Sequence, residues 1–266
     1  MSVKVEPSGR RSVEVETEVP GTPEEVWRAI ATGPGVSSWF VPTRFEEPDG
    51  KPAEVVCDFG PGMESRATVT AWEPPRRFAA ESRWSPEAPP IATEWFVEAR
   101  AGGVCSVRVV HSLFASDDEW DDQLTGTEIG WPVAFHVLRL YLSRFRGQRC
   151  EIVQVMGTFP GTTAEAWTAV TASLGLAGAE PGERRTAPDG APPLAGVVER
   201  SVEGQQLLVR TDRPGPGVAQ LYAVEMGGAV PVGVRLYLYG EEAPAVAAGA
   251  EPGWRRWLEA ITAGRS

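Results

Sequence analysis

Two histidines, His111 and His136, are the only imidazole side chains in this sequence of 266 residues. An imidazole titrates near neutral pH, so this pair could polarise a ligand carbonyl or act as acid and base. A surface position or a hydrogen-bonded structural role is the alternative for each. Without a matching cluster of cysteines or carboxylates, the pair is a poor metal site. The sequence therefore assigns no catalytic residue, no metal ligand and no cofactor, and whether the protein is an enzyme stays open.

Aromatic residues of the first half could line a small-molecule site together with these histidines. Such sites are commonly walled by apolar and aromatic side chains and contain few polar groups. For each aromatic ring the alternative is that it only fills a core. The candidate ligand-binding residues are Trp39, Phe40, Trp84, Trp95, His111, Phe114, Trp131, Phe135 and His136.

Charged residues add little to this site. Glu81, Arg83, Glu94 and Arg108 could face the same interior, but a shift of one residue in strand register would turn each toward solvent. The acidic run over residues 117–122 lacks the spacing of a calcium-binding loop, and no GxSxG nucleophile motif occurs. A solvated loop is the better interpretation of the acidic run.

A repeat organises the elements that must position these residues. Residues 20–30 recur as residues 160–170, an offset of 140, and six of the eleven positions are identical. Each copy has an alternating strand, a Pro-Gly-Thr turn and a helix that carries one Trp. Thr22 suits the N-cap of the first helix, and the two glutamates after Pro23 suit its first turn. A repeat at this spacing indicates two copies of one domain.

The first copy continues with short strands separated by Pro- and Gly-rich turns, which indicates an antiparallel sheet. Its last element is an apolar helix over residues 127–146, with Pro132 expected in the first turns. The second copy should end in a clearly shorter helix over residues 251–263. The expected strands are 12–19, 43–46, 53–59, 64–72, 77–84, 91–99 and 104–113 in the first copy, and 151–159, 195–201, 206–211, 218–226 and 232–239 in the second.

Composition excludes several classes of partner. The formal net charge is −11, and no basic run occurs, so nucleic acid is not an expected partner. No apolar run approaches the roughly 20 residues of a membrane helix, and no signal peptide is recognised, so membrane insertion is not expected. Three scattered cysteines favour reduced thiols and a cytoplasmic location.

Three segments of the first half carry a family resemblance: residues 39–43 (WFVPT), 69–78 (VTAWEPPRRF) and 130–132 (GWP). They resemble the bacterial homologues of the activator of heat-shock-protein-90 ATPase, a branch of the START-like (SRPBCC) superfamily. The resemblance covers residues 11–147 well and residues 150–264 only in outline. It implies a helix-grip fold, in which a curved sheet wraps a long helix and encloses a cavity for an apolar small molecule.

We therefore expect an α+β protein with two helix-grip domains. Residues 1–10 should form a flexible tail, residues 11–147 the first domain and residues 150–264 a degenerate second domain whose cavity is small or collapsed. The favoured function is binding of an apolar or amphipathic small molecule in the first domain. The alternatives are a protein-interaction or stress-adaptor role with a protein partner or homodimer, and a cyclase- or aromatase-type enzyme that uses a cavity histidine.

Overall fold

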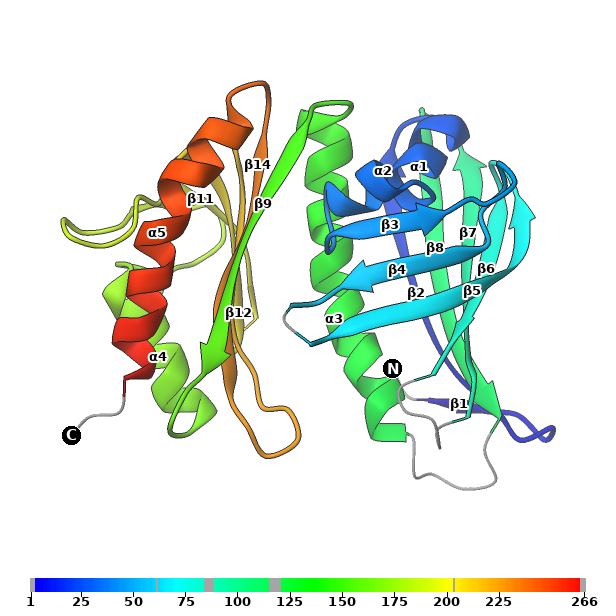
Figure 1. Ribbon diagram of the computed structural model, residues 1–266, viewed down its shortest axis with the longest axis horizontal. Coiled ribbons are helices and arrows are strands. Elements are labelled where there is room, and N and C mark those ends of the chain that lie inside the picture. Colours follow the sequence, from blue (N-terminus) through cyan, green and yellow to red (C-terminus); the bar gives the residue numbers. More distant parts are fainter. Residues whose placement is uncertain (1–2, 61, 84–88, 115–120, 203, 264–266) are drawn as a thin grey trace. The chain divides into compact units, whose positions relative to one another are not determined.

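A computed structural model describes residues 3–60, 62–83, 89–114, 121–202 and 204–263, with only the backbone described for residues 121–129. The chain divides into two compact units, Met1–Arg146 and Gly147–Ser266. Each unit has one antiparallel sheet, and a long helix closes each unit (Figure 1). The α+β fold class predicted from the sequence, with two helix-grip domains, is confirmed.

In the sheet of the first unit, the first long strand pairs directly with the last strand. β2 pairs with β8 along their whole length, from Arg10 opposite Phe114 to Pro20 opposite Val104. The spatial order is β1-β2-β8-β7-β6-β5-β4-β3, with every pair antiparallel. The strands are β1 (Lys4–Val5), β2 (Arg10–Pro20), β3 (Thr43–Glu46), β4 (Glu54–Asp58), β5 (Glu64–Glu73), β6 (Arg77–Ser82), β7 (Ile91–Arg100) and β8 (Val104–Phe114).

Two short helices follow β2 and position the segment that carries Trp39, one of the predicted ligand-binding residues. α1 (Pro23–Ile30) begins with the predicted N-cap, because the Thr22 hydroxyl accepts from the Glu25 N–H at 3.3 Å while the Glu25 carboxylate accepts from the Thr22 N–H. α2 (Gly33–Ser37) packs so closely on α1 that a Cβ on Gly35 would lie 1.9 Å from a backbone oxygen of α1. This contact fixes the segment that carries Trp39.

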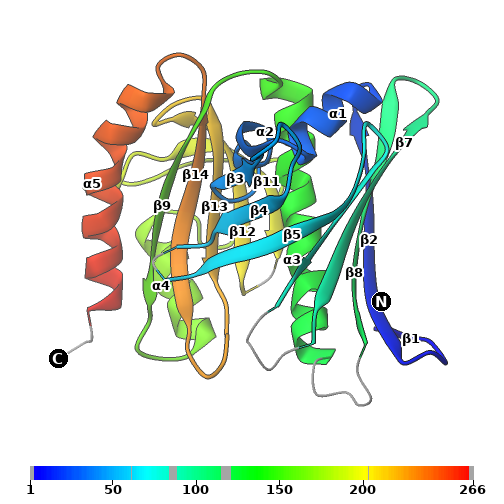
Figure 2. The ribbon, with the colours of Figure 1, turned by 45° about the vertical axis from the view of Figure 1, so that its right-hand side comes forward.

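The closing helix α3 (Asp121–Leu140) runs along one face of the curved sheet and contacts mainly β2 (Figures 1 and 2). A π-helical turn, Tyr141–Phe145, extends it. The sequence placed its start at residue 127, so Pro132 was expected in the first turns; Pro132 instead lies in the helix interior. Proline there removes one backbone hydrogen bond. Burial of Trp131 and Phe135 against Trp95 of the sheet offsets that loss.

The second unit repeats this order with fewer strands. Its sheet has the order β10-β11-β12-β13-β14-β9. α4 begins with the same capping box as α1, formed here by Thr162 and Glu165. The elements are β9 (Cys150–Thr158), α4 (Thr163–Ser173), β10 (Arg184–Thr186), β11 (Ala195–Val202), β12 (Gln206–Arg213), β13 (Gly217–Ala223), β14 (Pro231–Tyr239) and α5 (Ala243–Thr262).

The closing helix of the second unit is not short. α5 spans 20 residues and begins eight residues before the predicted start, although it is still shorter than α3 together with its π-helical turn. Pro244 lies in its first turn, where proline is favoured, and the alanines that follow have high helix propensity. Pro252 lies within this helix, as Pro132 does in α3.

The segment predicted as a flexible tail also contains structure. Lys4 and Val5 form β1 and pair with Ser12 and Arg11 of β2. A turn closes this hairpin, with the Glu6 N–H donating to the Arg10 carbonyl at 2.8 Å. Part of residues 1–10 therefore belongs to the sheet. Among the described residues, no helix is long and apolar enough to cross a membrane.

Candidate functional site

Five aromatic side chains meet between α3 and the sheet of the first unit, and we call them the aromatic cluster. Trp131 lies at its centre, with ring-centroid distances of 5.1 Å to Trp95, 5.2 Å to Phe40 and 5.5 Å to Phe135. Trp39 completes the cluster, 6.1 Å from Trp95. The rings occupy the space in which the sequence predicted a cavity.

Three separate elements supply this cluster. Trp131 and Phe135 are four residues apart on α3, so both side chains lie on one helix face. Trp95 lies on β7 opposite Phe78 of β6, and the two rings are stacked at 6.0 Å. Trp39 follows α2, and its indole N–H donates to the Ala29 carbonyl at 2.9 Å. The cluster is therefore held by helix packing, strand register and one hydrogen bond.

His111 is the polar group in contact with this cluster. Val13 of β2 and Thr93 of β7 lie directly opposite it in the sheet. The Trp131 Nε1–H donates to His111 Nε2 at 2.6 Å, and the Thr93 hydroxyl lies 2.9 Å from His111 Nδ1. Because Nε2 accepts from an indole, which can only donate, the neutral ring carries its proton on Nδ1 and donates it to Thr93.

Burial lowers the pKa of His111 from 6.5 to about 4. The cause is desolvation, because a charged imidazolium is disfavoured in an apolar surrounding. At neutral pH the ring is therefore uncharged, and both of its nitrogens are already in hydrogen bonds. In this arrangement His111 has no nitrogen available for proton transfer to a ligand.

Phe40 is the member of the cluster that reaches solvent. Trp39, Trp95, Trp131 and Phe135 are buried, whereas Phe40 is half-buried. Its ring stacks on Trp131 with an interplanar angle of 18° and meets the half-buried Phe59 edge-on at 5.7 Å. Phe40 also contacts the buried Trp39 at 5.7 Å, so its rotation would uncover one face of Trp131 at the loss of two ring contacts.

The other predicted site residues have different positions. Phe114 is 65% exposed and does not join the cluster, because side chains alternate along β8 and Leu113 takes the inward position. His136 is half-buried on α3. Trp84 lies outside the described residues. Thr93 and Phe78 were not among the predicted site residues, since only the strand pairing shows that they adjoin His111 and Trp95.

The four charged candidates do not enter the interior. Glu81 and Arg83 are exposed. Glu94 pairs with Arg77 at 2.9 Å, and the Arg108 guanidinium lies 4.2 Å from the centroid of the Phe96 ring. On β7, Glu94 and Phe96 alternate with Thr93 and Trp95, so Glu94 and the Arg108 guanidinium over Phe96 lie on the opposite face of the sheet.

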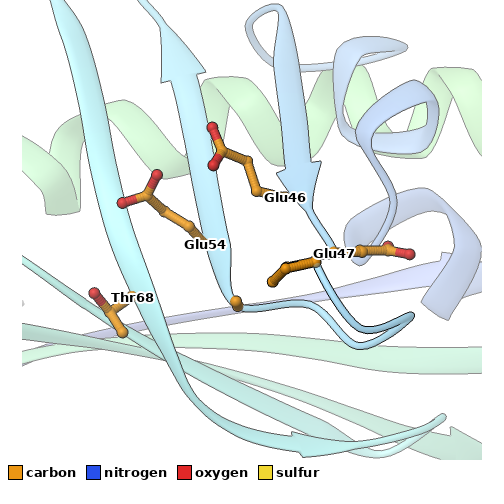
Figure 3. A pocket seen from close by; sticks show the side chains of 6 residues that line it. Glu46, Glu47, Glu54 and Thr68 are labelled. Atoms are coloured by element: carbon orange, nitrogen blue, oxygen red, sulfur yellow. The ribbon is translucent and has the colours of Figure 1, made fainter.

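A hollow of about 590 Å³ opens on the surface beside β3, β4 and β5, away from the aromatic cluster. Figure 3 shows the carboxylates of Glu46, Glu47 and Glu54 around it. Glu46 and Glu54 face each other across β3 and β4, and Arg66 contacts them at 3.4 and 2.6 Å. These are exposed ion pairs, and such pairs commonly contribute little energy. The hollow therefore ranks below the aromatic cluster as a site.

Neither metal ligands nor reactive thiols gather in the described part of the chain. It holds no group of three or more histidine, cysteine, aspartate or glutamate side chains placed to bind a metal ion. The three cysteines are free. Desolvation raises the pKa of the Cys57 thiol and raises the pKa of Cys150 to about 12, so these thiols are protonated near neutral pH.

Comparison with known proteins agrees with this fold. Residues 20–143 match the family described as activator of Hsp90 ATPase homolog 1-like protein, and this part of the chain is a domain of that family. No curated protein matches the chain.

The chain is also similar to several solved structures, all at low sequence identity and with TM-scores below 0.5. The di-domain ARO/CYC BexL from the BE-7585A biosynthetic pathway has 13% identity and a TM-score of 0.45, with 96% of this chain and 100% of that chain covered. Protein MLL2253 from Mesorhizobium loti has 22% identity and a TM-score of 0.44, with 50% and 98% covered. The Aha1 dimer from Colwellia psychrerythraea has 16% identity and a TM-score of 0.40, with 50% and 96% covered.

Proposed function

We propose that the first unit binds a planar apolar or amphipathic small molecule on the face of Trp131 that Phe40 covers. The observation that carries this proposal is the position of Phe40, a half-buried ring stacked at 5.2 Å on a buried one. An aromatic ligand that takes the place of Phe40 would keep the stacking interaction. Its apolar body would then be removed from water, which is the main source of affinity in such sites.

The state of His111, the polar residue beside the aromatic cluster, supports binding more than catalysis. His111 is uncharged at neutral pH, and its two nitrogens are bonded to Trp131 and Thr93. An acid–base role would require the hydrogen bond between His111 and Trp131 to break first. The histidine-dependent enzyme is therefore the weaker alternative. The protein-interaction role and the cytoplasmic location stay predictions from the sequence.

The test uses N-phenyl-1-naphthylamine, a neutral probe with a planar naphthyl ring, whose fluorescence rises in apolar surroundings. If the probe must displace Phe40, replacement by alanine removes that requirement. An aromatic pair contributes roughly 0.5–1.5 kcal/mol beyond buried area, so Phe40→Ala should tighten probe binding by roughly two- to tenfold. Trp131→Leu should weaken it, because the stacking surface is lost.

Phe45→Ala is the matched control in the same unit. Phe45 is also half-buried but contacts Trp72 and Phe78 instead of the aromatic cluster. Its replacement should leave the dissociation constant unchanged, with circular dichroism confirming that each variant is folded. Absence of probe binding to the wild type and to Phe40→Ala would contradict the proposal, as would equal effects of the two alanine variants.

A further inference from the structure

The second sheet ends in a long strand. β9 has nine residues and is the last strand of that sheet, and β14 is the strand that pairs with it in the described part of the chain. Figures 1 and 2 both show β9 at the border of the second sheet. The other border of this sheet is β10, which has only three residues. A long edge strand can pair with another chain, because one of its sides presents backbone donors and acceptors.

Alternate residues of β9 direct their backbone groups toward this border. The Phe159 N–H donates to the Val230 carbonyl at 2.9 Å, and the Gly240 N–H donates to the Arg149 carbonyl at 2.9 Å. Odd-numbered positions along β9 therefore face β14. Since residues alternate in this respect along an antiparallel strand, the even-numbered residues of the range 150–158 face outward, and we call them the β9 edge.

The repeat shows how β9 differs from β2, the corresponding strand of the first unit. With the offset of 140, the glutamates at positions 14, 16 and 18 correspond to Gln154, Met156 and Thr158. In the first sheet, β1 also covers the start of the β2 edge. Charged residues and covering strands both protect an edge from pairing with another chain. Within the described residues, β9 has neither these glutamates nor a covering strand.

The side chains of β9 are complementary to those of a second β9. In an antiparallel pair centred on Gln154, all nine residues of each strand are paired, and Ile152 lies opposite Met156 of the other copy. Glu151, the one charged residue of the strand, lies opposite Gly157. Apolar pairs across two strands stabilise a sheet, so this arrangement is favourable along its whole length.

The corresponding pair of two β2 strands would be unfavourable. Centred on Val15, the middle residue of β2, it would place Glu14 opposite Glu16 of the other copy on both sides of the centre. Like charges directly opposite one another destabilise a sheet. The difference between the two strands therefore favours pairing at β9 and opposes it at β2.

We propose that two copies of this chain associate through the β9 edge, as an antiparallel strand pair that joins their second sheets. The twofold axis passes through the pair of Gln154 residues, and Ile152 of each copy packs on Met156 of the other. This association goes beyond the binding function proposed for the first unit and does not depend on it.

The experiment is sedimentation equilibrium of the full chain. The wild type should form a species with twice the chain mass of 28.6 kDa. Ile152→Glu and Met156→Lys should each weaken association by roughly tenfold or more, because each puts a charge opposite an apolar side chain at two places in the dimer. In an equimolar mixture of the two variants, the new carboxylate lies opposite the new ammonium group, so a mixed dimer should form.

Ala164→Lys is the matched control, since Ala164 is exposed on α4 and the change adds the same charge as Met156→Lys. It should leave the association unchanged, with circular dichroism confirming that every variant is folded. In the wild type, hydrogen exchange of the Ile152 and Met156 amides should slow as the protein concentration rises.

A wild type that stays monomeric at every concentration would overturn the proposal. So would a dimer that persists in Met156→Lys, because a different surface would then hold it, or a mixture of the two variants that stays monomeric. N-phenyl-1-naphthylamine should bind equally well to the wild type and to Met156→Lys, so the failure of one proposal is distinguishable from the failure of the other.

Discussion

Lowering the pH from 7 to 5 should destabilise the first unit through His111. Its pKa is lowered from 6.5 to about 4 by burial. In the unfolded chain the imidazole takes up a proton as the pH falls below 6.5, whereas in the folded unit it stays neutral until about pH 4. The unfolded state then binds more protons, so the stability from this group is present above pH 6.5 and is lost as the pH falls toward 4.

The size of this effect follows from the pKa difference. At 1.36 kcal/mol for each pKa unit, the full loss is about 3 kcal/mol, of which roughly 2 kcal/mol develops between pH 7 and pH 5. A domain is commonly stable by only about 5–15 kcal/mol, so the loss is large enough to measure.

The assay is urea unfolding of the full chain at the two pH values, followed by methyl NMR signals of Val109 and Val137 so that the first unit is measured by itself. His111→Gln is the control, because its amide can accept from Trp131 and donate to Thr93 without titrating. His136 and all carboxylates are common to both proteins. The difference between wild type and His111→Gln should therefore isolate the titration of His111.

Equal losses of stability in both proteins between pH 7 and pH 5 would show that burial does not lower the pKa of His111. That result would mean that the folded protein takes up the His111 proton near pH 6.5. The hydrogen bond from Trp131 to a neutral imidazole would then be wrong.

Three further predictions concern the scaffold. Gly35→Ala should destabilise the first unit by several kcal/mol, because its Cβ would lie 1.9 Å from a backbone oxygen, while Gly130→Ala, with open space around it, should be neutral or slightly stabilising in thermal unfolding. Thr22→Ala and Thr162→Ala should each cost about 1 kcal/mol in urea unfolding, because each removes the capping hydroxyl of one helix. Cys150, with its pKa raised to about 12, should react with Ellman's reagent at pH 8 much more slowly in the folded protein than in urea; equal rates would contradict its burial.

The sheet could be predicted from the sequence because side chains alternate with period two. The β2 residues Val13 and Val19 are buried, while Glu16 and Glu18 are exposed, as their spacing indicates. The starts of the closing helices were predicted less well, because α3 begins six residues and α5 eight residues before the expected starts. Pro132 and Pro252 both lie within helices, where tertiary packing overrides local propensity.

Only part of the candidate site could be predicted from the sequence. Trp39, Trp95 and Trp131 could be chosen by residue type, but Phe114 could not be excluded without the strand register. The hydrogen bonds of His111 depend on Thr93, 18 residues earlier in the chain, and on a helix that packs across the sheet.

A crystal structure of the full chain with N-phenyl-1-naphthylamine would test directly whether the first unit binds a ligand on Trp131. The naphthyl ring should stack on Trp131, Phe40 should have rotated away from it, and the hydrogen bonds of His111 to Trp131 and Thr93 should be intact. A probe bound elsewhere, with Phe40 still stacked on Trp131, would show that this face of Trp131 is not the binding site.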